Sequence, residues 1–193
     1  MRNPSDRPAT YDDLAALPSN MVGQIIEGVL YAHPRPASDH AVASSGLGSV
    51  LTNSFQFGRG GPGGWWIIDE PELKLRRDIL VPDIAGWRTE RMPRVPRVPR
   101  FELASDWVCE ILSPSTVAVD RVLKKHVYAR EGVEFLWYLD PRARVLEAFA
   151  LRGGQWVEQG SWSGDVSVRA PPFDAVELDL SLLWLPEEPA QEE

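Results

Sequence analysis

The chain has 193 residues, a length that fits one domain better than two. Its composition, with 44% hydrophobic and 25% charged residues, is that of an ordinary globular protein, and its single cysteine, Cys109, excludes an internal disulfide. The net charge of −8 argues against a basic, non-specific coat for DNA, but it is compatible with an enzyme that gathers carboxylates around a metal ion.

The chain is expected to hold a flexible N-terminus at 1–10, a single domain at 11–186 and an acidic flexible tail at 187–193. Residues 1–10 are polar and lack the apolar stretch of a signal peptide. No run of the chain approaches the roughly 18 apolar residues of a membrane span. We therefore expect a cytoplasmic protein that makes no contact with a membrane.

Helices and strands are predicted to alternate along the chain. The expected helices lie at 11–17, at 39–55 with Ser38 as N-cap, and at 117–130. The expected strands lie at 24–31 (a hairpin turning at Gly28), 65–75, 79–87, 106–112, 134–139, 144–151 and 155–161, before a closing apolar segment at 178–185. Segment 106–112 is apolar on both faces and is therefore expected to be central. This order predicts an α/β fold with a mixed central β-sheet flanked by α-helices.

The helix expected at 117–130 carries both an apolar stripe and polar residues at helical spacing. The stripe is expected to comprise Val119, Val122, Leu123, His126 and Val127. Lys124 lies at the edge of this stripe, one turn after Asp120 and one turn before Tyr128.

Two acidic residues stand inside otherwise apolar strands. Asp83 follows Val81 and Pro82, and Glu110 lies in the central strand. An acid in an apolar strand costs free energy unless it is paired, and a cation is one possible partner. Mg²⁺ prefers carboxylate oxygens, and phosphodiester hydrolysis uses such a cation to neutralise phosphate charge and acidify water. The two acids therefore point to a Mg²⁺ or Mn²⁺ site of a hydrolase that acts on phosphodiester bonds.

Lysine is rare in this chain, because 17 of the 20 basic residues are arginines. Arginine stays protonated, whereas a lysine ammonium can lose its proton, so a lysine is placed where that chemistry matters. Lys124 is therefore a candidate to assist the scissile phosphate or the attacking water. Each residue also has a structural interpretation: Glu110 as a buried salt bridge, Asp83 as a turn residue, and Lys124 as a solvated helix residue.

Short motifs are spread over nearly the whole chain. They are Glu27-Gly28, His40, Pro82-Asp83, the run 109–116, Asp120, Lys124, Tyr128, Gly132-Val133 and Asp140-Pro141. From about residue 11 to 186 this pattern resembles the Uma-two family of restriction-endonuclease-like proteins, in the PD-(D/E)XK nuclease superfamily. The resemblance implies a restriction-endonuclease-like fold, a divalent-metal endonuclease acting on DNA, and often a homodimer.

The resemblance also implies roles for single residues. Asp83 and Glu110 become metal ligands, with the backbone carbonyl of Ile111 as a third. The superfamily expects a lysine two residues after the second acid, but this chain has Leu112 there. The resemblance implies that the lysine has moved to the following helix, where Lys124 stands.

Two further residues are secondary candidates for the catalytic site. Glu27 would ligate a metal or hydrogen-bond a metal-bound water, and His40 would contact phosphate or orient a ligand. A satisfied core histidine is the alternative for His40, and His33 and His126 are assigned to structure. A catalytically inactive nuclease-fold module that binds nucleic acid or protein is the alternative to the endonuclease.

A basic, proline-rich loop is the other candidate contact for DNA. Arg91, Arg94, Arg97 and Arg100 recur at every third residue. Polyproline II has three residues per turn, so these side chains would line one edge and bind phosphates. A mobile, solvated loop is the alternative interpretation. DNA is thus the expected partner, no organic cofactor is expected, and the eight tryptophans are expected to form core and a homodimer surface.

Overall fold

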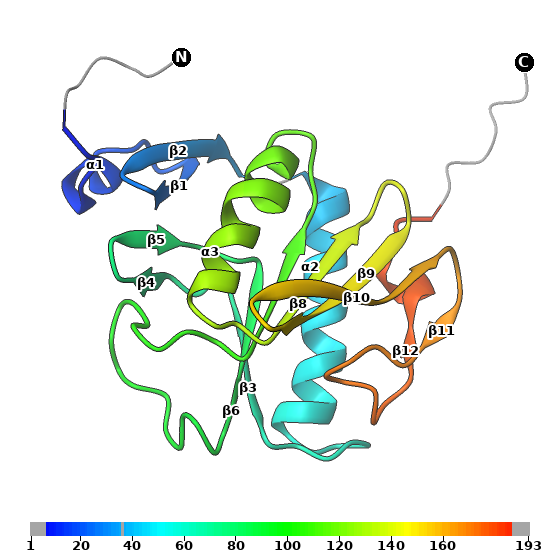
Figure 1. Ribbon diagram of the computed structural model, residues 1–193. Coiled ribbons are helices and arrows are strands. Elements are labelled where there is room, and N and C mark those ends of the chain that lie inside the picture. Colours follow the sequence, from blue (N-terminus) through cyan, green and yellow to red (C-terminus); the bar gives the residue numbers. More distant parts are fainter. Residues whose placement is uncertain (1–6, 36, 187–193) are drawn as a thin grey trace, which may run out of the picture.

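The centre of the computed structural model, which describes residues 7–35 and 37–186, is a six-stranded sheet in the order β10-β9-β8-β7-β6-β3 (Figure 1). Its strands are β3 (Trp65–Asp69), β6 (Ile84–Arg88), β7 (Trp107–Ile111), β8 (Phe135–Asp140), β9 (Val145–Arg152) and β10 (Gln155–Ser163). Strands β7 and β8 run parallel, and the other neighbours are antiparallel. The α/β fold with a mixed central sheet, predicted from the sequence, is confirmed.

A second, four-stranded sheet lies beside one end of the central sheet (Figure 1). Its order is β2-β1-β5-β4, and its strands are β1 (Met21–Ile26), β2 (Val29–Pro34), β4 (Leu73–Leu75) and β5 (Asp78–Leu80). A two-stranded ribbon of β11 (Ser167–Val168) and β12 (Leu178–Asp179) completes the strands of the described chain.

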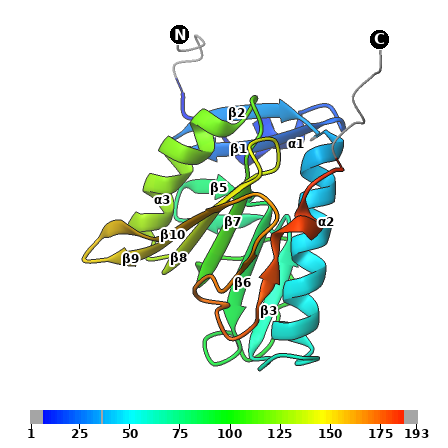
Figure 2. The same ribbon diagram turned by 90° about the vertical axis from the view of Figure 1, so that its right-hand side faces the viewer.

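Helices cover the two faces of the central sheet (Figure 2). Helix α2 (Ser38–Leu51) continues into the π-helical turn η1 (Thr52–Gln56) on one face, where the 3-10 turn η3 (Leu180–Leu183) also packs. The other face carries the π-helical segment η2 (Val119–Lys124) and α3 (Lys125–Arg130), and α1 (Tyr11–Ala15) precedes β1. No helix in the described part of the chain has the length and apolar character needed to cross a bilayer.

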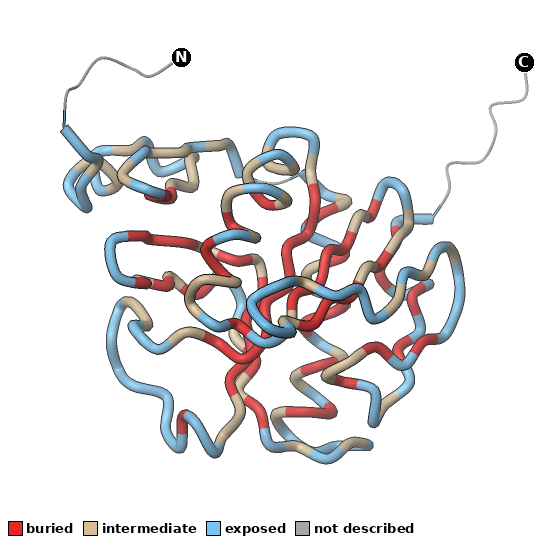
Figure 3. The backbone as a smooth tube through the Cα atoms, in the orientation of Figure 1, coloured by how far each residue is buried: buried red, intermediate tan, exposed pale blue. Residues whose placement is uncertain are grey.

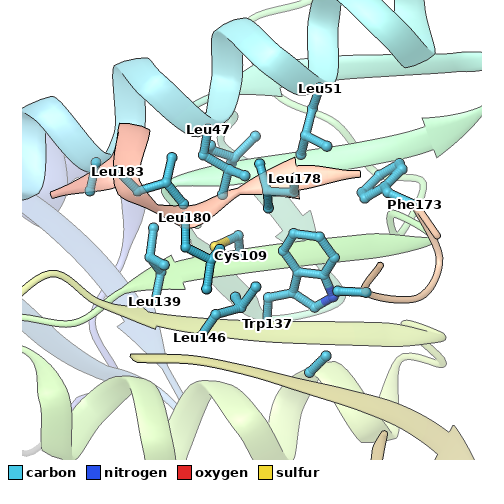
Figure 4. Packing of buried hydrophobic residues seen from close by; sticks show 14 of the residues in the cluster. Leu47, Leu51, Cys109, Trp137, Leu139, Leu146, Phe173, Leu178, Leu180 and Leu183 are labelled. Atoms are coloured by element: carbon cyan, nitrogen blue, oxygen red, sulfur yellow. The ribbon is translucent and has the colours of Figure 1, made fainter. Parts of the chain in front are cut away.

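Two hydrophobic clusters hold these layers together. Many of the buried residues lie in the central strands (Figure 3). Because side chains alternate along a strand, β7 supplies Cys109 and Ile111 to one cluster and Val108 to the other. In the first cluster Leu47 packs with residues of η3 and the sheet (Figure 4). In the second, Leu112 packs with the helix that follows β7, so it belongs to the core.

Several predicted element boundaries differ from the structure. Ser38 is the first residue of α2 and Ala37 is its N-cap, so the predicted cap was one residue late. The predicted strand at 65–75 is broken into β3 and β4, around Pro71, which lacks a backbone N–H to continue a ladder. The strand expected at 79–87 is likewise broken, so Asp83 lies just before β6 rather than within a strand. The expected tail at 187–193 and residues 1–6 lie outside the described residues.

The apolar stripe predicted for the helix at 117–130 is partly wrong. Val122 is 64% exposed and His126 is exposed, whereas Asp120 and Lys124 are buried. The inward face of the helix is polar at these two positions because Lys124 pairs with the buried Glu110 of β7 and with Asp120. Six residues of the helix, Val119–Lys124, form a π-helical segment, a local widening that is frequent at functional sites.

Candidate active site

The two predicted metal-binding acids lie opposite each other on neighbouring strands. Ile84 pairs with Cys109 in the antiparallel ladder of β6 and β7, so the preceding Asp83 falls opposite Glu110. Asp83 Oδ2 accepts a hydrogen bond from the backbone N–H of Ile111 at 2.6 Å, which ties the carboxylate to the end of β7. This register places both carboxylates at one end of the central strands.

Glu110 is fully buried and is held from the helix side by two donors. Lys124 Nζ donates to Glu110 Oε2 at 2.7 Å, and the Tyr128 hydroxyl donates to Glu110 Oε1 at 2.5 Å. Because Lys124 and Tyr128 are four residues apart on one helix, they reach the same carboxylate from successive turns. The helix therefore fixes the position of Glu110 through both of its oxygens.

Lys124 is itself surrounded by acceptors. Besides Glu110, its ammonium contacts Asp120 Oδ1 at 3.1 Å and the Val81 carbonyl oxygen at 3.2 Å. Although burial disfavours an ammonium ion, the carboxylates of Glu110 and Asp120 raise the pKa of Lys124 above its usual range. Lys124 is thus a buried cation at neutral pH.

Asp83 is paired with His40 from the first turn of α2. His40 Nε2 lies 3.0 Å from Asp83 Oδ1, and the His40 side chain is 9% exposed. Burial opposes protonation of the ring, but the Asp83 carboxylate outweighs it and the pKa of His40 is raised. Helix α2 therefore brings a second basic partner to the acid pair.

These side chains border one small cavity of about 30 Å³, enough for one or two water-sized groups. Its lining residues are Val22, His33, Pro34, His40, Glu70, Val81, Asp83, Glu110, Ser113, Ser115, Thr116, Asp120 and Lys124. Four of them are acidic, against one lysine and two histidines, so the cavity has a surplus of negative charge.

The charge and ligand types of this cavity fit a divalent metal. Mg²⁺ needs only one or two carboxylates because water supplies its other ligands, and Asp83 and Glu110 offer two. Burial raises the pKa of Glu110 to about 8, and Asp120 and Asp83 act in the same direction against Lys124. Because burial and the neighbouring acids disfavour the ionised form of Glu110, an added positive charge nearby would stabilise its carboxylate. No group of three or more His, Cys, Asp or Glu side chains within the described ranges forms a preassembled metal cage.

Two of the predicted site residues are placed away from this cavity. Glu27 is exposed at the turn between β1 and β2, and its backbone N–H donates to the buried Asp78 at 2.6 Å. Ile111 does not line the cavity, and its N–H, rather than its carbonyl, contacts Asp83. The structure therefore brings together His40, Asp83, Glu110 and Lys124, and leaves Glu27 on the surface.

The basic loop begins where β6 ends, at the opposite end of this strand from Asp83. Arg91 is exposed, but its guanidinium is not free for a phosphate as predicted, because it donates to the buried carboxylate of Asp106 at 2.8 Å. Arg100 contacts Glu72 and stacks over the ring of Tyr11. The loop bends repeatedly between these anchored ends, so its arginines do not form one straight rail.

Three groups of the site were not among the predicted site residues. Asp120 and Tyr128 lie four residues before and after Lys124, and this i, i+4, i+8 spacing was the signal that could have identified them. His33 lies on β2, in a different sheet, and was assigned to structure, but it lines the cavity. The sequence around His33 does not predict that it lines the cavity, because its place there depends on how the two sheets pack.

The central mixed sheet, with acids on adjacent strands and a lysine from the next helix, defines a restriction-endonuclease-like protein. The sequence profile of the Uma2 family, described as "Putative restriction endonuclease", matches residues 8–181. The chain therefore belongs to the Uma2 family.

A solved structure supports the same assignment. It is the "Crystal structure of a putative nuclease belonging to DUF820 from Anabaena variabilis ATCC 29413", similar to this chain at 25% identity and a TM-score of 0.70. The match covers 91% of this chain and 97% of that one. The search of curated proteins gave no match.

Proposed function

We propose that this protein is an endonuclease that hydrolyses phosphodiester bonds of DNA with Mg²⁺ or Mn²⁺. The observation that carries the proposal is the buried Glu110, clamped by Lys124 and Tyr128 and lying opposite Asp83 at a small acidic cavity. A structural salt bridge alone would not need a second acid on the neighbouring strand or a third on the helix. Membership of the Uma2 family points to the same chemistry.

In this proposal Asp83 and Glu110 hold the metal, which when bound neutralises phosphate charge and acidifies a water molecule. His40 keeps Asp83 in place through Nε2, and Tyr128 does the same for Glu110 through its hydroxyl. Lys124 holds a positive charge beside Glu110, from where it stabilises negative charge that develops on the phosphate during attack without a direct hydrogen bond to it.

The direct test is incubation of the purified protein with supercoiled plasmid and with single- and double-stranded oligonucleotides, in Mg²⁺, Mn²⁺ or EDTA. We expect cutting that requires the metal and is lost in Asp83→Asn and Glu110→Gln. The matched control is Glu158→Gln, which changes an exposed acid of β10. Cutting by Glu110→Gln at the rate of the wild type would refute the proposal.

An inactive nuclease-fold module is the alternative outcome of the same experiment. All four carboxylate oxygens of Asp83 and Glu110 already have a protein partner, an arrangement that also suits a purely structural network. DNA binding without cutting in any of these metals would favour this alternative.

A further inference from the structure

We propose that the hydroxyl groups of Ser113, Ser115 and Thr116 form the part of the cavity that contacts the scissile phosphate. This inference rests on the proposed nuclease function and adds the substrate contact to it. All three residues line the cavity that also holds Asp83 and Glu110. They follow directly after β7, so the strand that positions Glu110 also positions the hydroxyls.

A phosphate that approaches two carboxylates needs hydrogen-bond donors, and the Lys124 ammonium and His40 Nε2 already have acceptors. An ammonium has three N–H donors, and Lys124 has three acceptors: Glu110, Asp120 and the Val81 carbonyl. His40 uses Nε2 on Asp83. Lys124 Nζ and His40 Nε2 therefore cannot donate to a phosphate without giving up a contact to Glu110, Asp120, Val81 or Asp83.

His33 does not fill this need in its neutral form. Its Nδ1 lies 3.0 Å from the carbonyl oxygen of Pro34, which can only accept, so Nδ1 carries the proton. The remaining ring nitrogen is then an acceptor, which a phosphate oxygen would avoid. The three hydroxyls are further donors among the side chains that line the cavity.

The hydroxyl cluster has a donor to spare. Ser113 Oγ lies 3.0 Å from both Ser115 Oγ and Thr116 Oγ1. Each hydroxyl carries one O–H, so two hydrogen bonds among three hydroxyls use two protons and leave one. That O–H can donate to a phosphate oxygen while the cluster stays intact. Hydroxyls are also uncharged, so they do not compete with a metal for the carboxylates.

The test uses the double variant Ser115→Ala/Thr116→Val, which removes two hydroxyls with little change of volume. Its affinity for fluorescently labelled single- and double-stranded oligonucleotides is measured by anisotropy in EDTA across a salt series. We expect roughly tenfold weaker binding, because the one hydrogen bond that the cluster donates to a charged phosphate oxygen is lost. The salt dependence should keep the slope of the wild type, because no cation is removed. Ser163→Ala, on exposed β10, should bind as the wild type does.

A double variant that folds as the wild type by circular dichroism and binds with unchanged affinity would overturn the inference. A changed salt slope would also overturn it, because that result assigns the loss to charge. The proposed function fails separately, if the wild type cuts no substrate in Mg²⁺ or Mn²⁺, because the EDTA measurement requires no cleavage.

Discussion

Replacing Lys124 with methionine removes an ammonium that lies 2.7 Å from Glu110 and 3.1 Å from Asp120. Both acids are buried, and breaking a buried ion pair typically costs about 3–5 kcal/mol. We expect the free energy of unfolding to fall by about this amount in EDTA. A divalent cation can take the place of the ammonium, so Mn²⁺ should restore about 2.7 kcal/mol at 100 times its Kd.

Urea denaturation followed by tryptophan fluorescence measures this free energy with and without Mn²⁺. Lys125→Met is the matched control, because Lys125 Nζ lies 4.4 Å from the ring centroid of Phe149 and contacts no acid of the cavity. It should lose about 0.5–1 kcal/mol and gain no extra stability from Mn²⁺ over the wild type. Equal stability of Lys124→Met and wild type in EDTA, or equal stabilisation of both by the same concentration of Mn²⁺, would refute the reasoning. In the plasmid assay, Lys124→Met should cut roughly 10²-fold more slowly.

Four further outcomes are expected. Metal affinity, measured by calorimetry, should rise from about pH 6 to 9, because the metal competes with protons for Glu110, whose pKa burial raises to about 8. Glu110→Gln should flatten this rise. Arg94→Ala/Arg97→Ala should weaken DNA binding in anisotropy and lower the salt slope by about 2, with the cleavage rate at saturating DNA nearly unchanged. Arg91→Ala should instead lower the melting temperature, because it leaves the buried Asp106 with one cation fewer. The protein should form a homodimer in light scattering at micromolar concentration, and a monomer mass would contradict this expectation.

The sequence predicted the acid pair because an acid in an apolar strand is a local signal. Glu110 stands in a run whose five residues are all buried, and Asp83 follows a proline at the start of the neighbouring strand. Both positions follow from strand order and side-chain alternation alone. Lys124 reaches the same cavity from the next helix, as the family resemblance implied.

The parts that could not be predicted depend on contacts between distant segments. The π-helical segment at Val119–Lys124 changes the register of the helix, and the residue types of the segment do not predict this change. The period-three spacing of the basic loop predicted a straight edge, but Arg91 finds a buried carboxylate 15 residues later in the chain. His33 reaches the cavity only because two sheets meet there.

The contacts that define the cavity join segments far apart in the chain. Lys124 contacts Glu110 across 14 residues and Val81 across 43, and Asp83 contacts Ile111 across 28. A growing chain that ends before the helix holds both acids but not the ammonium that pairs with Glu110. The complete set of charges exists only once strands and helix have docked. The charge arrangement of the cavity and the native fold therefore arise in one step.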